Sequence, residues 1–166
     1  NTLRFLLANL TDFNPEKDSI PTDDCLEIDR YMLALTVALQ ENLTQSYQHY
    51  EFHQAVHQLH NFCSEDLGGF YLDILKDRLY TSATHGLPRR SAQTALYHIA
   101  HSLVRLFAPI LSFTAEETWE HLTGDTEGSV LLQLWHVFPQ QYDVSELQQR
   151  WQSIRTLRAK VLKKLE

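Results

Sequence analysis

Apolar residues recur every three or four positions along most of this chain, which is the spacing of one face of an α-helix. Two long runs, over residues 28–47 and 92–110, follow this pattern without interruption. A third run covers residues 52–74 and keeps its phase through Gly68 and Gly69. We therefore predict one continuous helix there, although each glycine costs about 1 kcal/mol relative to alanine. The apolar positions of the three helices are Ile28, Met32, Leu35, Leu39, Leu43 and Tyr47; Phe52, Val56, Leu59, Cys63, Leu67, Phe70 and Ile74; and Ala92, Leu96, Ile99, Leu103, Phe107 and Ile110.

Helices are also expected at both ends of the chain. Leucines at helical spacing among the first ten residues indicate the last turns of a helix that is truncated at residue 1. Residues 144–166 are expected to form a C-terminal helix that leads into a tail beyond this sequence. Its apolar face carries Leu147, Trp151, Ile154, Val161 and Leu165.

Proline and polar residues mark the boundaries of the first helices. Residues 11–21 contain two prolines and are expected to form a loop. Thr22 or Asp23 can cap the helix that follows, because a side-chain oxygen can accept a bond from a free N–H group of the first turn. Pro109 is expected to kink or end the helix over residues 92–110.

The segment after Pro109 is expected to contain one more short helix. Residues 114–117 match a capping box that would start it, and residues 124–128 contain two glycines and indicate a loop. Residues 130–135 form a short apolar run that can be either a strand or extended coil. Amphipathic helices with short connections predict an all-α fold, an antiparallel helix bundle with a possible short extended segment near 130–135.

The composition is that of an ordinary soluble globular domain, with 43% hydrophobic and 21% charged residues in a length of 166. No apolar run approaches the 18 residues of a membrane-spanning helix, so no membrane association is expected. The two cysteines, Cys25 and Cys63, indicate buried thiols in a reducing cytoplasm rather than a disulfide framework. The only methionine is Met32, and we expect residues 1–166 to be a single domain excised from a longer protein.

Charge is segregated along the chain, which the net charge of −7 hides. Residues 5–75 hold twelve acids and two bases, whereas four of the fourteen cations fall within residues 76–90 and six within residues 150–164. This distribution is typical either of a surface that follows nucleic-acid phosphates or of solvated helix faces. The six cations near the C-terminus are Arg150, Arg155, Arg158, Lys160, Lys163 and Lys164.

The segment around residues 76–93 combines the groups that RNA recognition uses. Arginine and lysine neutralise phosphates, and an aromatic ring can stack on an unpaired base. Alternatively, Tyr80 covers an end of the bundle, and each arginine serves in a structural ion pair. The candidate RNA-binding residues of this segment are Lys76, Arg78, Tyr80, Arg89, Arg90 and Gln93.

Four sequence segments resemble those of a known family: NTLRFLLANL, FYLDILKDRLYT, RRSAQTALYHIA and APILSFTAEETW. In this order they resemble the anticodon-binding helical domain of bacterial-type isoleucyl-tRNA synthetases, which are class I enzymes. The resemblance implies a helix bundle that binds the anticodon stem-loop of isoleucine tRNA. It also adds Arg4 as a tRNA-binding candidate, in a first helix that lies near the stem-loop in this family. Arg155 and Arg158 are candidates from the basic C-terminal helix, interpreted as a surface that follows phosphates.

The resemblance further implies a parent enzyme that joins isoleucine to its tRNA with ATP and magnesium. Catalytic motifs are expected upstream of residue 1, so this piece carries no catalytic residue and should be inactive alone. A zinc-binding tail is expected beyond residue 166. The implied partners are the tRNA and the catalytic and tail domains of the same chain, within a cytoplasmic monomer.

Two other classes of function are compatible with the residues. The first alternative is a helical scaffold that binds other proteins and no nucleic acid. The second uses a stripe of histidines at residues 49, 53, 57 and 60, whose spacing can hold zinc. No glutamate or cysteine completes a zinc site there, so we interpret the stripe as a polar helix face and predict no metal.

Overall fold

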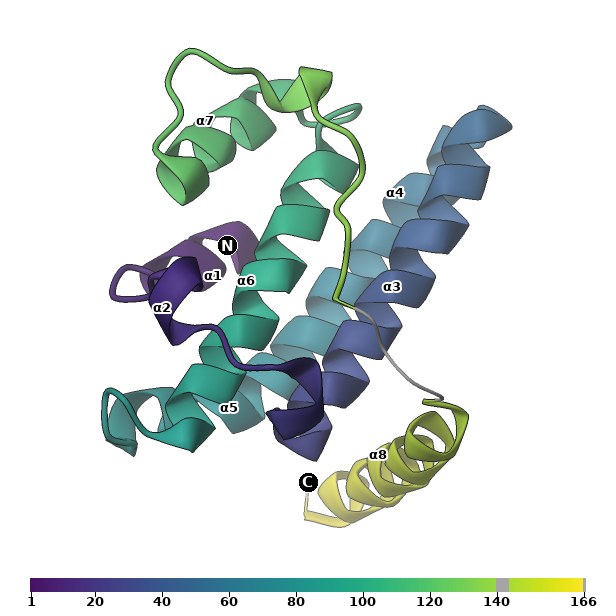
Figure 1. Ribbon diagram of the computed structural model, residues 1–166. Helices are drawn as coiled ribbons and strands as arrows, with labels where there is room; N and C mark the ends of the chain where they lie inside the picture. The colour runs from purple at the N-terminus through teal and green to yellow at the C-terminus, as the bar shows by residue number, and fades with distance from the viewer. Residues whose placement is uncertain (140–143, 166) are drawn as a thin grey trace.

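The computed structural model describes residues 1–139 and 144–165 of the chain (Figure 1). Within these residues the fold is all-α and contains no strand, which confirms the predicted fold class. Three-residue 3₁₀ turns lie at Thr22–Asp24 and Val130–Leu132, and a π-helical segment covers Phe62–Leu72. The α-helices are α1 (Thr2–Ala8), α2 (Pro15–Asp18), α3 (Glu27–Gln48), α4 (Phe52–Asn61), α5 (Asp73–Thr81), α6 (Leu87–Phe107), α7 (Ser112–Thr123) and α8 (Ser145–Leu165).

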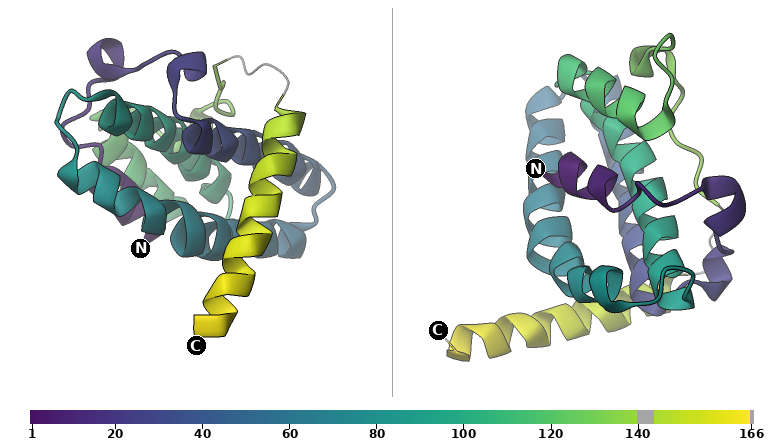
Figure 2. Two further views of the ribbon diagram at one scale, coloured as in Figure 1. Left: turned by 90° about the horizontal axis from the view of Figure 1, so that it is seen from below. Right: turned by 90° about the vertical axis from the view of Figure 1, so that its left-hand side faces the viewer.

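Three long rods form the body of the molecule. One is α3, the second is α4 continued through the π-helical segment into α5, and the third is α6 (Figure 1). The second rod runs antiparallel to the other two, and both α1 and α7 pack against α6. The C-terminal α8 lies across the bundle, crosses α3 and projects beyond it (Figure 2).

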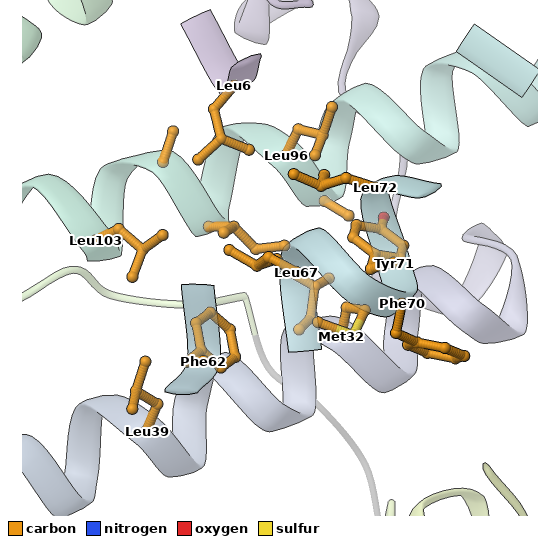
Figure 3. Close-up of a cluster of buried hydrophobic side chains, with 14 of the residues drawn as sticks. Leu6, Met32, Leu39, Phe62, Leu67, Phe70, Tyr71, Leu72, Leu96 and Leu103 are labelled. Atoms are coloured by element: carbon orange, nitrogen blue, oxygen red, sulfur yellow. The ribbon is translucent and has the colours of Figure 1, made fainter. Parts of the chain in front are cut away.

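The core lies between the three rods. Leu6 of α1, Met32 of α3, Leu67 of the π-helical segment and two leucines of α6, Leu96 and Leu103, are all fully buried in one cluster (Figure 3). Burial of such side chains stabilises the fold by about 1.5–3 kcal/mol each. A smaller cluster joins α6 to α7 and contains Val104, Ala108, Ala115, Trp119 and Val130.

The helix through Gly68 and Gly69 is continuous, as predicted, but its apolar face is only partly as predicted. Phe52 and Val56, before the glycines, are 45% and 47% exposed. The predicted position Ile74 is 41% exposed, whereas its neighbour Leu75 is 1% exposed and Leu79 is fully buried. A π-helix takes more residues per turn than an α-helix, because each N–H bonds five residues back. The π-helical segment therefore advances the buried face by one residue.

Two expectations for the first third of the chain are wrong. Residues 11–21 are not only a loop, because they contain α2, which Asn14 caps by accepting a hydrogen bond from the N–H of Glu16. Neither Thr22 nor Asp23 caps α3, because both lie in a separate 3₁₀ turn. The cap position of α3 is Leu26, whose own N–H donates to the Ser91 hydroxyl of α6 at 2.8 Å. No side chain caps the first turn of α3, and its start is instead fixed to α6 through the N–H of Leu26.

After α6, some of the predicted helix boundaries are confirmed and others are wrong. The helix ends at Phe107, two residues before Pro109, as expected. The predicted capping box is wrong, because α7 begins at Ser112 and Thr114 lies within it. Gly124 ends α7 with a left-handed φ of 73°, which glycine adopts without strain. Of the two forms considered for residues 130–135, a strand is excluded, because the segment starts as a 3₁₀ turn and continues without regular structure.

Candidate nucleic-acid interface

Arg78 of α5 belongs to a buried polar network. Its guanidinium pairs at 2.5 Å with the carboxylate of Asp29 in α3, which is fully buried. The same carboxylate accepts hydrogen bonds from the Tyr71 hydroxyl at 2.7 Å and from the Ser91 hydroxyl. Burial, and then the charge of Asp29, raise the pKa of the Tyr71 hydroxyl well above its usual value. The network joins all three rods, and it leaves the Arg78 side chain only 17% exposed.

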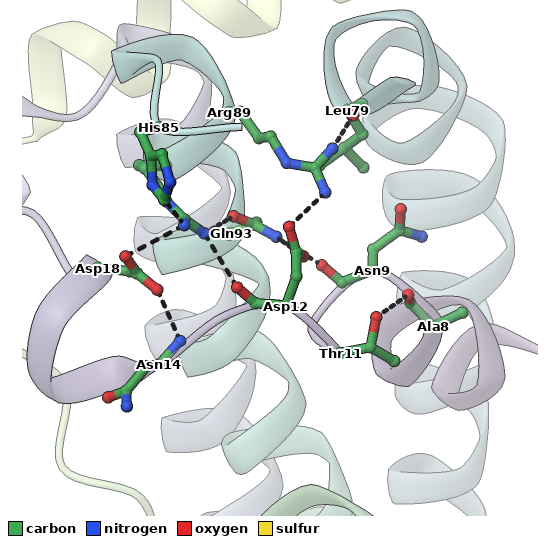
Figure 4. Close-up of polar contacts among 11 residues, drawn as sticks. Ala8, Asn9, Thr11, Asp12, Asn14, Asp18, Leu79, His85, Arg89 and Gln93 are labelled. Atoms are coloured by element: carbon green, nitrogen blue, oxygen red, sulfur yellow. Dashed lines mark hydrogen bonds and ion pairs between the residues drawn. The ribbon is translucent and has the colours of Figure 1, made fainter. Parts of the chain in front are cut away.

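Arg89, Arg90 and Gln93, at the start of α6, hold the segment that links α1 to α2 (Figure 4). Arg89 pairs with Asp12 at 2.9 Å and also donates to the carbonyl oxygen of Leu79. Arg90 pairs with Asp18 at 3.1 Å and donates to the Gln93 amide oxygen at 2.7 Å. These side chains therefore fasten residues 9–18 to α6.

The amide group of Gln93 completes this attachment from a fully buried position. It donates to the carbonyl oxygen of Asn9 at 3.0 Å and to the Asp12 carboxylate at 2.7 Å. Burial raises the pKa of the Asp12 carboxyl, but the hydrogen bonds from Arg89 and Gln93 and the charge of Arg89 outweigh it, so this pKa lies below its usual value. Asp12 therefore stays ionised and keeps both contacts at neutral pH.

The arginines of α8 face the bundle. Arg155 pairs with Asp66 at 2.6 Å, donates to the Tyr31 hydroxyl and lies 4.8 Å above the ring of Phe70. Arg158 pairs with Asp73 and donates to the carbonyl oxygen of Gly69, both at 3.1 Å. Nearer the start of the helix, Trp151 stacks on the ring of Tyr31 at a centroid distance of 5.7 Å. These contacts hold α8 against α3 and the π-helical segment.

Two of the predicted residues lie together and exposed on α5. The Tyr80 ring is 69% exposed, and no ring of the described residues stacks on it. Lys76, one turn earlier, is half exposed and pairs with Asp73 at 2.9 Å. This hydrogen bond and the charge of Asp73 raise the pKa of the Lys76 ammonium group. The C-terminal half of α5 therefore offers a cation and a free aromatic ring to solvent.

Arg4 lies elsewhere on the molecule. It lines a groove of about 730 Å³ between α1, α4, the end of α6 and α7. Of the residues of the second rod that line this groove, Ser64 is nearest to Lys76, on the order of 15–20 Å away along the helix. The structure thus brings Lys76 and Tyr80 together and places Arg4 apart from them. The apolar side chains that line the groove include Leu3, Leu7, Val56, Leu59, Phe107 and Ile110.

The cations of α8 lie on two sides of the helix. The predicted site residues Arg155 and Arg158 are on the side that faces the bundle. Arg155 and Arg158 follow Trp151 by four and seven residues, so they share its bundle-facing side. Lys160, Lys163 and Lys164 lie on the opposite side and are exposed. The three lysines were not among the predicted site residues, although their positions relative to Trp151 already distinguish them from the arginines.

The histidines form no metal site, because no group of three or more metal-ligating side chains is suitably arranged within residues 1–139 and 144–165. A different set, His98, His101 and His136, packs together beside α6, and the His98 and His136 rings are joined by a 2.9 Å hydrogen bond. Burial lowers the pKa of His98 and of His101 to about 4, and that of His136 to about 3. These three side chains are therefore neutral at pH 7.

Burial raises the pKa of the Cys25 thiol to about 11 and also raises that of Cys63, so both thiols are protonated at neutral pH. No helix in the described part of the chain has the length and apolar character needed to cross a membrane.

Comparison with known proteins agrees with the resemblance noted in the sequence. The chain is 65% identical over 170 residues to the isoleucine–tRNA ligase of Nitrosomonas europaea. It is 57% and 58% identical, each over 166 residues, to the isoleucine–tRNA ligases of Dechloromonas aromatica and Thiobacillus denitrificans. Each match covers 100% of the chain and 18% of the relative, so the chain spans about a fifth of the length of these curated relatives.

A family model described as the anticodon-binding domain of tRNA ligase matches residues 29–165. The match extends from the first turn of α3 to the last residue of α8, and so includes the three rods and the docked helix. With the all-α bundle, it confirms the resemblance to the anticodon-binding domain of isoleucyl-tRNA synthetases. The chain belongs to the family of anticodon-binding domains of tRNA ligases.

Proposed function

We propose that this chain is a single domain that binds the anticodon stem-loop of isoleucine tRNA within a longer isoleucine–tRNA ligase. The observation that carries the proposal is the match of the family model over residues 29–165. The exposed chemistry supports it, because Lys76 and Tyr80 supply a phosphate-binding cation and a stacking ring on one helix. Arg4 is proposed as a separate contact from α1.

The remaining candidate residues are proposed to act indirectly. The guanidinium groups of Arg78, Arg89 and Arg90 and the amide of Gln93 already have carboxylate or carbonyl partners. Releasing Arg78 to bind RNA would leave the fully buried charge of Asp29 without a partner, which costs several kcal/mol, and releasing the others would detach residues 9–18 from α6. Arg78, Arg89, Arg90 and Gln93 therefore hold α5 and the start of α6 in place, while Arg155 and Arg158 hold α8.

In the proposed parent enzyme, docking of the anticodon stem-loop positions the distant acceptor end of the tRNA for reaction. The correct tRNA is held in a productive pose, and this differential binding gives selectivity. ATP and magnesium would serve a catalytic domain outside these residues, and zinc a C-terminal tail. We also propose that the parent is a cytoplasmic monomer.

The proposal is tested by measuring the binding of the chain to isoleucine tRNA, and to the same tRNA with a changed anticodon, across a series of salt concentrations. We expect tighter binding to the correct anticodon, and a log–log salt slope of about one per phosphate contact. Tyr80→Ala should reduce the preference between the two RNAs, because a stacked base is worth about 1–3 kcal/mol.

Phe113→Ala is the matched control, since Phe113 is 94% exposed on α7 and is not part of the proposed site. It should leave the anticodon preference unchanged. If the wild-type chain shows no salt-dependent binding to either RNA, the proposed function is wrong.

The groove beside Arg4 is the observation that favours the alternative, a protein-interaction scaffold. Its lining is mainly apolar, and Val56 and Leu111 are nearly half exposed there. A scaffold would bind its partner through apolar contact, with little dependence on salt, whereas RNA binding weakens steeply as salt increases. The salt series above therefore distinguishes the two functions.

A further inference from the structure

The cations of α8 differ in what they contact. Each of its three arginines pairs with a carboxylate of the bundle: Arg150 with Glu27, Arg155 with Asp66 and Arg158 with Asp73. The three lysines make no ion pair or hydrogen bond with any residue that the structure describes. The arginines therefore attach the helix, and the charge of the lysines is available to a partner.

The lysines share one face of the helix. At 3.6 residues per turn, Lys160, Lys163 and Lys164 lie on the side opposite Trp151 and Arg155. Gln149 and Gln152 continue the same face toward the start of α8, and both line a shallow depression together with Lys160. The face extends about 21 Å from Gln149 to Lys163 at roughly 1.5 Å per residue. It contains amide and ammonium donors, and no acid occurs in the chain between Glu146 and Glu166.

This face is held on a fixed support rather than on a mobile tail. Leu147 is buried in the core cluster, and Trp151 packs edge-on against Phe70 in addition to its stack on Tyr31. The helix projects beyond the bundle at its C-terminal end, where the lysines lie (Figure 2). Unpaired cations displayed in this way, on a chain of net charge −7, fit a polyanion.

We propose that Lys160, Lys163 and Lys164 bind the phosphate backbone of the RNA, independently of its sequence. This inference rests on the proposed function and adds to it a second contact surface, separate from the exposed end of α5. Ammonium groups act as point charges that do not read base edges, so this face would contribute affinity and orientation while Tyr80 contributes selectivity. Glutamine side chains are common phosphate ligands and would extend the contact.

The test compares the wild-type chain with the triple variant K160Q/K163Q/K164Q in the salt series on isoleucine tRNA. Glutamine keeps the helix and a hydrogen-bond donor but removes the charge. We expect the salt slope to fall by about two to three, at roughly 0.7–0.9 per lost phosphate contact. The affinity at about 0.1 M salt should fall by roughly two orders of magnitude, because the two salt lines approach each other only near 1 M. The loss should be the same for the correct and the changed anticodon.

A matched pair of single variants provides the control. Lys160→Gln and Lys17→Gln each remove one exposed lysine, and the Lys17 ammonium likewise makes no ion pair within the described residues. Only Lys160→Gln should reduce the salt slope, by about one. Circular dichroism should show the same helix content in all variants.

Different results would overturn this inference alone or the proposed function together with it. If the wild-type chain binds RNA with a steep salt slope and the triple variant retains it, other cations neutralise the phosphates and the inference is overturned. A triple variant that loses binding only to the correct anticodon also overturns it, because the lysines would then act in base selection. Absence of salt-dependent binding by the wild-type chain removes both this inference and the proposed function.

Discussion

The carboxylate of Asp29 is the point at which the three rods of the bundle meet. It accepts from Tyr71, Arg78 and Ser91, and it is fully buried. Without it, the Arg78 guanidinium and the Tyr71 hydroxyl would stay in the interior with no partner. A buried polar group in that state costs far more than the net value of the bond that it lost.

We therefore predict that Asp29→Ala lowers the free energy of unfolding by about 3–5 kcal/mol. Urea unfolding followed by circular dichroism measures the change. Asp77→Ala, at an exposed position of α5, is the control and should change the free energy by less than about 0.5 kcal/mol. Similar, small effects of the two variants would show that the network is not a main source of stability.

The three packed histidines give the fold a dependence on pH. An unfolded histidine takes up a proton near pH 6.5, whereas burial holds the folded pKa of His98 and His101 at about 4 and that of His136 at about 3. Between these values only the unfolded chain binds the protons. The stabilising contribution is thus complete above pH 6.5 and is lost as the pH falls through this window.

We predict that the free energy of unfolding decreases between pH 6.5 and pH 5, by at most about 1.4 kcal/mol per pH unit for each histidine. Urea unfolding at the two pH values measures the slope. His136→Gln should reduce it, and His49→Gln, at an exposed position, should not. A slope of the same size in wild type and His136→Gln would contradict the assignment.

At the scale of the helices, regular spacing was a reliable guide in α3 and α6. The predicted faces of α3 and α6 contain Met32, Leu43, Leu96 and Leu103, all of them fully buried. Spacing failed in the second rod. Phe52 and Val56 of α4 are nearly half exposed, and after Leu67 the α-helical period was extended through a π-helical segment that the sequence did not indicate. The caps failed for another reason: α3 begins at an uncapped position, Leu26, whose N–H is held by Ser91, 65 residues away along the chain.

The shift in phase can be tested by two neighbouring substitutions. Leu75→Ala should lower the free energy of unfolding by about 2–5 kcal/mol, because it leaves a cavity in the core. Ile74→Ala should cost less than about 1 kcal/mol, since that side chain is 41% exposed. Urea unfolding of the two variants decides between the registers, because an uninterrupted α-helix predicts the opposite order.

At the scale of the whole molecule, sequence patterns located the cations but could not assign their roles. The segregation of charge and the identity of the candidate groups were evident from the sequence alone. Whether an arginine faces solvent depends on a partner that is distant in sequence: Asp29 lies 49 residues from Arg78, and Asp12 lies 77 residues from Arg89. Only the folded arrangement distinguishes such an arginine from the exposed lysines of α8.

The two functions of α8, support and charge, can be separated by truncation. A chain that ends at residue 138 loses the buried Leu147 and the stacked Trp151, and we expect its free energy of unfolding to fall by roughly 3–5 kcal/mol. A chain that ends at residue 159 loses only the last turns, in which residues 160–164 are exposed, and should unfold within about 1 kcal/mol of wild type.

Urea unfolding measures both changes. The chain that ends at residue 159 should still show a lower salt slope of RNA binding than the wild-type chain, because it lacks the three lysines. Equal stability of the two truncated chains would mean that the contacts of Leu147 and Trp151 contribute little.

The internal pairing of Arg78 has a consequence for genetics. Replacing this residue removes one half of a buried ion pair, and the damage is to folding, so it grows with temperature. In a living cell such an allele would support growth in the cold and fail when warmed, and second-site changes that stabilise the bundle anywhere would suppress it. Alleles at Tyr80, the proposed RNA contact, should behave in the opposite way. They would be indifferent to temperature and, on that proposal, could be suppressed only by raising the supply of tRNA or by altering the anticodon loop.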